Sequence, residues 1–137
     1  RSYPINPIAD LVHSNIDLIV NLSASPYNVG KQHLREAMLK HSAVSFQKPI
    51  IYTNQVGGND DLIFDGRSFA VNRQGEIIAR GQGFVSDFIT VEFNANQQDL
   101  VLGNISPVYE SEEAEIWNAL VLGVKDYVHK CRFSKVL

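Results

Sequence analysis

The first third of the chain alternates between helical and buried-strand patterns. Asn6-Pro7 supplies a helix cap and a first-turn proline ahead of apolar residues at helical spacing, so we expect a short helix over residues 6–14. Residues 17–22 are apolar on both faces, which predicts a strand covered on two sides. A helix of about 16 residues should follow the 21–31 loop and end at Lys48-Pro49. Its apolar stripe is expected to contain Leu34, Ala37, Met38, His41 and either Val44 or Ser45.

A second apolar strand, residues 49–54, ends in polar side chains as the first one does. Beyond Leu62 the apolar positions recur with a period of two, which is typical of half-buried strands. Residues 67–72 and 76–80 flank a Gln74-Gly75 turn and predict a β-hairpin, and residues 86–93 predict a further strand. Two strand-and-helix units followed by an antiparallel meander indicate an α/β fold built in layers.

The last part of the chain is a connector followed by a helix. Residues 94–109 have little periodicity, so we interpret them as a domain boundary. Ser111 caps a helix with an acidic start and a basic end, which suits the helix dipole. Residues 133–137 read like the start of a buried strand without partners, so we expect a piece of a longer polypeptide. The helix has a wide apolar stripe that needs a partner layer: Ile116, Leu120, Val124 and Tyr127, flanked by Trp117, Val121 and Val128.

Composition narrows the functional class. The 137 residues, 45% hydrophobic and 20% charged, suffice for one domain with a core. A net charge of −3 with interspersed signs argues against a nucleic-acid partner. No apolar run approaches the roughly 20 residues of a membrane span, and no signal-peptide pattern opens the chain. The single cysteine, Cys131, excludes an internal disulfide and fits a reducing compartment, so we expect a cytoplasmic protein. No Cys or His pair has metal-ligand spacing, so we expect no metal.

The loop over residues 21–31 has the layout of a ligand site. It follows an apolar strand and leads into a helix, and α/β layers place pockets at such positions. Ser25 could donate or accept a hydrogen bond, and Lys31 offers a mobile cation for a carboxylate or phosphate. Alternatively, Ser23 and Ser25 satisfy turn backbone and Lys31 is a solvated first-turn residue.

The next loop, residues 55–61, gives weaker signals. Gly57-Gly58 would let main chain approach a neighbour closely, but the phosphate-binding loop pattern is absent. Asp60 and Asp61 are consecutive and would diverge, so we interpret them as solvated or ion-paired rather than as an acid/base pair. His41 is interpreted as a hydrogen-bonded residue at the edge of the core.

Four segments together resemble the glutamine-dependent NAD synthetases: NLSASPYNVGK, IIYTNQVGGNDDLIFDG, RQGEIIARG and EIWNALVLGVKDYVHK. They cover nearly the whole chain in the family's order. The resemblance implies that residues 1–105 are the C-terminal half of a glutaminase (carbon-nitrogen hydrolase) domain of the nitrilase superfamily. Residues 106–137 would be the linker and first helix of the synthetase domain. The implied fold is a partial nitrilase-like α-β-β-α sandwich followed by one long helix.

The resemblance also implies a chemistry. A cysteine nucleophile, a Glu base and a Lys would hydrolyse glutamine, and the ammonia would amidate adenylated deamido-NAD to give NAD, AMP and pyrophosphate. All three catalytic residues would precede Arg1, so we expect no catalytic residue in this chain, no activity of the chain alone, and a packing or surface role for Cys131. ATP and Mg²⁺ are implied for the full-length enzyme, with no cofactor on these residues, and a homo-oligomer is expected.

Carried over residue by residue, the resemblance assigns glutamine binding to Ser25 and Lys31. Asn54, Gln55, Gly57 and Gly58 match a stretch near the pocket and the path between domains. Two other interpretations remain open: a free-standing nitrilase-type amidohydrolase, against which the final helix argues, and a non-catalytic packing or oligomerisation module.

Overall fold

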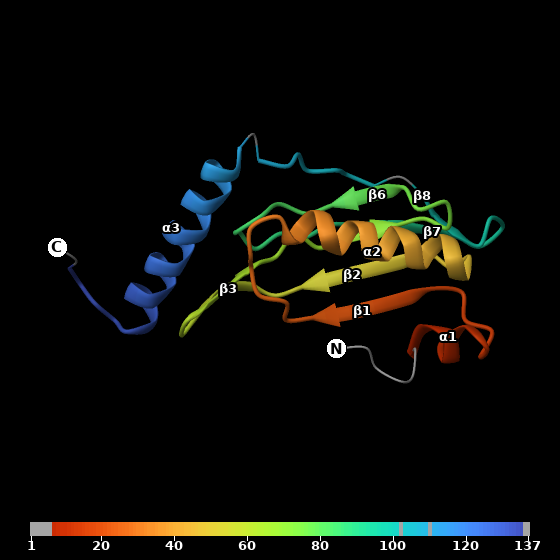
Figure 1. Ribbon diagram of the computed structural model, residues 1–137, viewed down its shortest axis with the longest axis horizontal. Coiled ribbons are helices and arrows are strands. Elements are labelled where there is room, and N and C mark those ends of the chain that lie inside the picture. The colour runs from red at the N-terminus through yellow and green to blue at the C-terminus, as the bar shows by residue number, and fades with distance from the viewer. Residues whose placement is uncertain (1–6, 102, 110, 136–137) are drawn as a thin grey trace.

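The computed structural model describes residues 7–101, 103–109 and 111–135. Figure 1 shows a layered body with one helix, α3, standing beside it. In chain order the elements are α1 Pro7–Val12, β1 Ile19–Ser23, α2 Lys31–Phe46, β2 Ile50–Asn54, β3 Val56–Asn59, β4 Leu62–Asp65, β5 Phe69–Val71, β6 Ile77–Arg80, β7 Glu92–Asn94, β8 Asp99–Val101 and α3 Glu112–Lys130.

The main sheet has the strand order β1-β2-β5-β6. β1 and β2 are parallel, with Ser23 opposite Asn54, and α2 connects them across one face (Figure 1). β5 and β6 form the predicted hairpin and add antiparallel to β2. Because β1 and β2 are parallel and in register, their polar carboxyl ends lie side by side. This is the edge of the sheet where the candidate loop begins.

Two apolar clusters cover the two faces of this sheet. Beneath α2, Ile19, Ile50 and Phe69 form one cluster together with Ala43 from the helix. On the opposite face, Ile78 and Leu100 form the other, with Ile89 and Val91 packed against it. The alternation of Ile50 and Ile51 between the clusters is the period of two expected for a strand covered on both faces. The predicted α/β fold in layers is confirmed.

The length of α2 is as predicted, but its predicted inward face is wrong. Leu34 and Met38 are 59% and 60% exposed, and Val44 and His41 also face outward. The buried positions of the helix are Gln32, Arg35, Glu36 and Ala43. Polar groups can lie inward here because ion pairs and hydrogen bonds satisfy them. His41 is therefore exposed, with its ring 3.4 Å from the Ser45 hydroxyl, rather than at the edge of the core.

The first strand was also expected to be covered on both faces, and this is wrong for the described residues. β1 lies at the edge of the sheet, and Val20 and Leu22 are 56% and 79% exposed. Only Ile19 of this strand is fully buried. The preceding helix is shorter than predicted: α1 spans Pro7–Val12, and residue 6 lies outside the described residues.

Three segments differ from the predicted strands and loops. Residues 56–65, expected as a loop and a strand, form the hairpin β3–β4. Residues 86–91 form no ladder, because they lie across the second apolar cluster and pack by side chains alone. The expected connector contains the end of a small hairpin, β7–β8. Residues 133–135 form no strand, and the last two residues of that prediction lie outside the described part.

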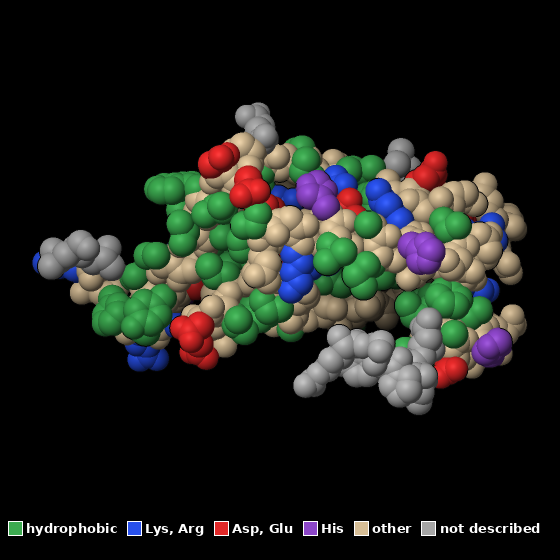
Figure 2. Space-filling view, in the orientation of Figure 1, with side chains coloured by type: hydrophobic (Ala, Val, Ile, Leu, Met, Phe, Trp, Pro, Cys, Tyr) green, Lys and Arg blue, Asp and Glu red, His purple; other side chains and the backbone are tan. Residues whose placement is uncertain are grey.

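The last helix begins as predicted. The Ser111 hydroxyl accepts a hydrogen bond from the amide of Ala114, a standard N-cap. Its apolar stripe remains exposed, including Trp117, Leu120 and Val124, and Figure 2 shows hydrophobic side chains gathered over this end of the molecule. α3 contacts the body through the β3–β4 hairpin.

Candidate functional site

The loop after β1 stands where two parallel strands end. Ser25 is the second residue after the end of β1, and the end of β2 lies beside it through the Ser23–Asn54 pairing. Gly30, with φ of 72°, makes the turn into α2 in a left-handed conformation that favours glycine. Lys31 is thereby placed on the first turn of the helix, next to the loop that carries Ser25.

Asn54 holds the Ser25 backbone from the end of β2. Its Oδ1 accepts the Ser25 amide hydrogen at 2.8 Å, and its Nδ2 donates to the Ser25 carbonyl at 3.1 Å. The side chain thus imitates a strand partner and extends the β1–β2 pairing to Ser25, two residues beyond the end of β1. Asn54, which the resemblance placed near the pocket, is buried. In the structure its side chain holds the backbone of Ser25.

Arg35 on α2 holds the same loop from the other side. Its Nη2 donates to the carbonyls of Ser25 at 2.8 Å and Pro26 at 3.0 Å, and its Nε lies 3.3 Å from the Ser25 Oγ. Its Nη1 donates to both carboxylate oxygens of Asp65, at 2.9 and 2.7 Å. Arg35 and Asp65 are 7% and 1% exposed, so this is a buried ion pair.

Ser25 and Lys31 line one cavity of about 280 Å³. The Lys31 Nζ donates to the Pro26 carbonyl at 2.9 Å, which leaves two of its three ammonium hydrogens for a ligand. The remaining wall is partly polar, from Asn21 and Ser23, and partly apolar. A hydroxyl and an ammonium group beside an apolar wall can bind a small molecule with an oxygen acceptor and an aliphatic part. The other lining residues are Leu34, Arg35, Met38, Leu39 and Tyr52.

The remaining sequence-predicted residues lie elsewhere. Gln55 has an exposed side chain, and its amide donates to the Ser23 carbonyl at 3.0 Å. Gly57 and Gly58 lie on β3 against α3, away from the cavity of Ser25. A Cβ on Gly58 would come within 3.2 Å of the Cα of Gly123, so the close approach predicted for this pair is to a helix. The amide of Gly58 donates to Asp126 Oδ2 at 2.7 Å, and its carbonyl accepts from Lys130.

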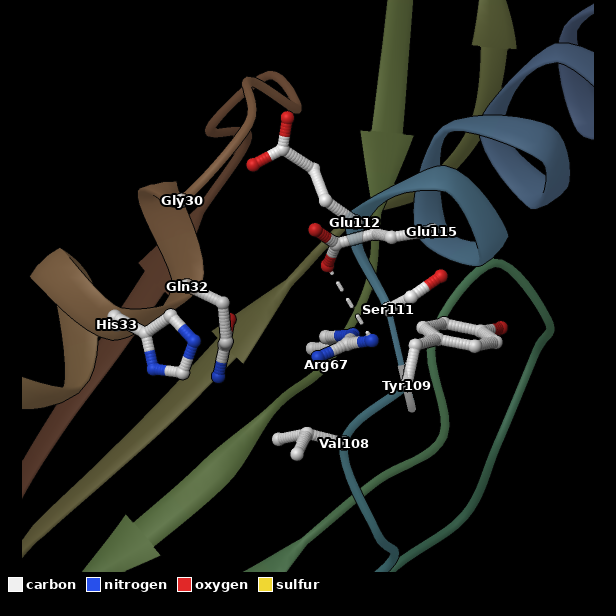
Figure 3. A pocket seen from close by; sticks show the side chains of 9 residues that line it. All are labelled: Gly30, Gln32, His33, Arg67, Val108, Tyr109, Ser111, Glu112 and Glu115. Carbon is white, nitrogen blue, oxygen red and sulfur yellow. Dashed lines mark ion pairs between the residues drawn. The ribbon is translucent and has the colours of Figure 1, made fainter.

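A second cavity, of about 220 Å³, lies between the start of α2 and the start of α3 (Figure 3). Arg67 is its central charge. The guanidinium stacks 4.8 Å from the centre of the Tyr109 ring, and its Nη2 lies 3.4 Å from Glu115 Oε1. Burial, followed by the negative charge of Glu115, raises the pKa of nearby Tyr27 to about 12, so this phenol stays protonated at neutral pH.

Glu36 is another buried polar residue of α2, and it pairs with Arg80 on β6. Arg80 donates to its two oxygens at 2.8 and 3.0 Å, and Gln32 donates at 2.9 Å. Burial opposes ionisation of Glu36, but the hydrogen bonds from Arg80 and Gln32 outweigh it and hold the pKa below the ordinary value. Glu36 is therefore a carboxylate at neutral pH, and it fixes the helix to the far strand of the sheet.

Sequence reasoning missed Arg35, Asp65 and Asn54 as supports of the loop. Arg35 lies outside the predicted apolar stripe of its helix, so the pattern predicted that it faces solvent. Asp65 comes after three apolar residues and before a glycine, where an aspartate is common in a turn. The available signal was the spacing of Lys31 and Arg35, one helical turn apart and both near the loop. Neither a metal-binding group of three or more His, Cys, Asp or Glu residues nor a helix able to cross a membrane occurs among the described residues.

Comparison with known proteins places these features in a family context. Residues 2–100 match the family model described as carbon-nitrogen hydrolase. The glutamine-dependent NAD(+) synthetase of Synechocystis sp. (strain PCC 6803) is 50% identical over 137 residues, which is all of this chain and 25% of that protein. The chain therefore spans about a quarter of the length of the curated relatives it matches.

Solved structures agree in fold. The glutamine-dependent NAD+ synthetase from Acinetobacter baumannii, in complex with adenosine diphosphate, is 38% identical with a TM-score of 0.83, over 89% of this chain and 23% of that one. A carbon-nitrogen hydrolase from Helicobacter pylori G27, only 17% identical, has a TM-score of 0.53 over 94% of this chain and 45% of that one. The predicted resemblance and the partial nitrilase-like fold are both confirmed.

Proposed function

The chain belongs to the carbon-nitrogen hydrolase family, and from this membership we propose that it forms part of a glutamine-dependent NAD synthetase. In this proposal the parent polypeptide hydrolyses glutamine and delivers the ammonia to adenylated deamido-NAD. The observation that carries the proposal is the match at 50% identity over all 137 residues of this chain, together with the cavity that Ser25 and Lys31 share.

The residues of this chain bind the amino acid and do not attack it. The Lys31 ammonium and the Ser25 hydroxyl hold glutamine by its oxygen atoms, while Leu34 and Met38 contact its methylenes. Amide hydrolysis needs a thiolate nucleophile and an acid that protonates the leaving nitrogen. We assign both to parts of the parent polypeptide outside residues 1–137. The single cysteine, Cys131, is exposed and lines a different cavity, beside Lys130 and Asp60.

The same proposal divides the chain into two parts. Residues 1–105 belong to the glutaminase domain, and residues 106–137 are the linker and first helix of the synthetase domain. The seam between them is then the contact of α3 with β3 and β4, where Gly58 is held by Asp126 and Lys130. ATP and Mg²⁺ act in the remainder of the parent polypeptide.

The test uses the full-length polypeptide with Lys31→Ala. We expect the KM for glutamine to rise roughly tenfold to a hundredfold, because a hydrogen bond from a charged group is lost. Synthesis of NAD from free ammonia should continue at the original rate. Steady-state rates with the two nitrogen donors measure both effects.

Lys40→Ala is the matched control, because Lys40 lies on the same helix but does not line the cavity. It should leave both rates unchanged. Equal loss with glutamine and ammonia in Lys31→Ala would contradict the proposal, and so would an unaltered KM for glutamine.

A further inference from the structure

We infer that Arg35 is a positioning residue of the glutamine site, which fixes the Ser25 hydroxyl as a hydrogen-bond donor to the ligand. This inference rests on the proposed function, because it concerns the same cavity. It adds a residue that does not touch the substrate but determines what Ser25 can bind.

The Ser25 hydroxyl lies beside the guanidinium of Arg35. The Arg35 Nε and Nη2 lie 3.3 and 3.2 Å from the Ser25 Oγ. A guanidinium is permanently charged and has only donors, whereas a hydroxyl has one hydrogen and two lone pairs. The two Nη2 hydrogens also serve the carbonyls of Ser25 and Pro26, at 2.8 and 3.0 Å, so the Nε hydrogen is the one available to the hydroxyl alone. Because Arg35 can only donate, the hydroxyl hydrogen must turn towards another acceptor. The free direction is the cavity that Ser25 lines.

A buried carboxylate, Asp65, keeps Arg35 in place. Asp65 is almost completely buried, and both of its oxygens accept from the Arg35 Nη1. Asn54 Nδ2 lies 3.4 Å from the same carboxylate and also grips the Ser25 backbone. The negative charge of Asp65 holds the guanidinium against the Ser25 loop, at the wall of the cavity that Arg35 also lines. A buried ion pair contributes little net stability compared with apolar packing, so its main effect here is on geometry.

The hydrogens that Ser25 and Lys31 offer determine which kind of ligand group binds there. Ser25 offers its hydrogen on the side that faces away from Arg35, and Lys31 offers only hydrogens. Both groups therefore select an acceptor, and the charge of Lys31 favours a carboxylate. We assign the carboxylate of the amino-acid substrate to this pair, and its ammonium group to another part of the site.

The experiment is a double-mutant cycle on the full-length polypeptide, with Ser25→Ala, Arg35→Lys and the combination. Each single variant should raise the KM for glutamine about tenfold, the factor for one ordinary hydrogen bond, with little change in kcat. In the double variant the KM for glutamine should be no higher than in Ser25→Ala alone, because Arg35 acts through that hydroxyl. Arg73→Lys is the control: Arg73 forms an ion pair with Asp99 at 3.4 Å on a distant hairpin turn and should change nothing.

Each other result has a distinct meaning. If the two single effects multiply in the double variant, Arg35 does not act through Ser25 and the inference is overturned. Loss of ammonia-driven synthesis in Arg35→Lys, equal to the loss with glutamine, would show a merely structural role and also overturn it. If neither Ser25→Ala nor Lys31→Ala alters the KM for glutamine, the proposed function itself fails.

A second measurement needs no variant, in case Arg35→Lys prevents folding. A crystal structure of the full-length polypeptide with bound glutamate should place an oxygen of the ligand's α-carboxylate within hydrogen-bond distance of the Ser25 Oγ. Arg35 should still contact Ser25 and Asp65. A ligand nitrogen at Ser25, or a direct bond from Arg35 to the ligand, would refute the inference.

Discussion

Two side chains from separate elements bind the backbone of Ser25, and a third side chain holds both of them. Asn54 reaches it from β2, Arg35 from α2, and Asp65 at the end of β4 binds both of them. Each group is buried and each is paired, so the usual cost of burying polar atoms is offset. Long-range polar contacts therefore hold the Ser25 end of the loop, whereas a local turn bond, from the Lys31 amide to the Asn28 carbonyl at 3.0 Å, closes its helix end.

A single residue, Glu36, should make the stability of the fold depend on pH in the acidic range. Its folded-state pKa lies below the ordinary value of 4.5, so its contribution is present above pH 4.5 and is lost as the pH falls through the folded-state pKa. In Glu36→Gln the apparent midpoint of thermal unfolding should vary less between pH 7 and pH 3. The midpoint is followed by circular dichroism of the full-length polypeptide.

The control for this measurement is Glu92→Gln, the same chemical change at an exposed position on β7. Its curve should run parallel to that of the unaltered protein. Parallel curves for Glu36→Gln as well would show that the pair with Arg80 does not stabilise the fold.

The sequence could locate the Ser25–Lys31 loop but not its supports. A polar loop after a buried strand is recognisable from composition alone, and Ser25 and Lys31 do share a cavity. Arg35 and Asp65 are 30 positions apart, and no local pattern relates a helix arginine to a strand-end aspartate. Their pairing follows from the tertiary arrangement of α2 and β4, which periodicity does not encode.

At the scale of elements, the helices show where periodicity is informative. The cap, the start and the amphipathic character of α3 followed from local chemistry and were predicted correctly. For α2 the length was right and the inward face was wrong, because the pattern assumes that apolar residues always face the core. The hairpin β3–β4 was missed because its first strand carries Gly57 and Gly58, which are poor strand formers.

The contact between α3 and β3 supports a prediction for Asp126→Asn. This change removes the charge from the acceptor of the Gly58 amide hydrogen, which is bonded at 2.7 Å, and should weaken the local contact by about 1 kcal/mol. Native-state hydrogen exchange of the Gly58 amide should accelerate roughly fivefold, the factor for that energy.

Lys125→Ala provides the comparison, because Lys125 is the exposed neighbour of Asp126 on the same helix. Exchange at Gly58 should stay slow in that variant. An unchanged exchange rate in Asp126→Asn would mean that packing at Gly123 and the hydrogen bond from Lys130 hold the helix to β3 without help from the Asp126 charge.

For the whole molecule, the exposed apolar surface is the dominant property. Large hydrophobic side chains are exposed on β1, on α2 and along α3, and Figure 2 shows several of them on one side of the molecule. Soluble monomers rarely expose continuous apolar patches of this kind. Relatives that are four times as long carry further chain that could cover such surfaces.

We therefore expect the 137-residue chain by itself to associate as its concentration rises. Leu120→Glu combined with Val124→Glu places two charges in the exposed stripe of α3 and should shift the chain towards monomer. Sedimentation velocity over a range of micromolar concentrations measures the shift.

Gln97→Glu combined with Gln98→Glu adds the same two charges to an exposed turn and should leave the association intact. A chain that stays monomeric at every concentration would refute the expectation. Association that both double variants abolish equally would trace it to net charge instead of to the stripe on α3.

The shared carboxylate of Asp65 has an evolutionary consequence. Loss of any one member of its trio leaves the others with an uncompensated charge or an idle donor inside the protein. Residues that only line the cavity can therefore be substituted one at a time. Asp65, Arg35 and Asn54, which hold Ser25, have to be exchanged together. Selectivity is free to diverge among descendants of this sequence while the frame that presents it stays fixed.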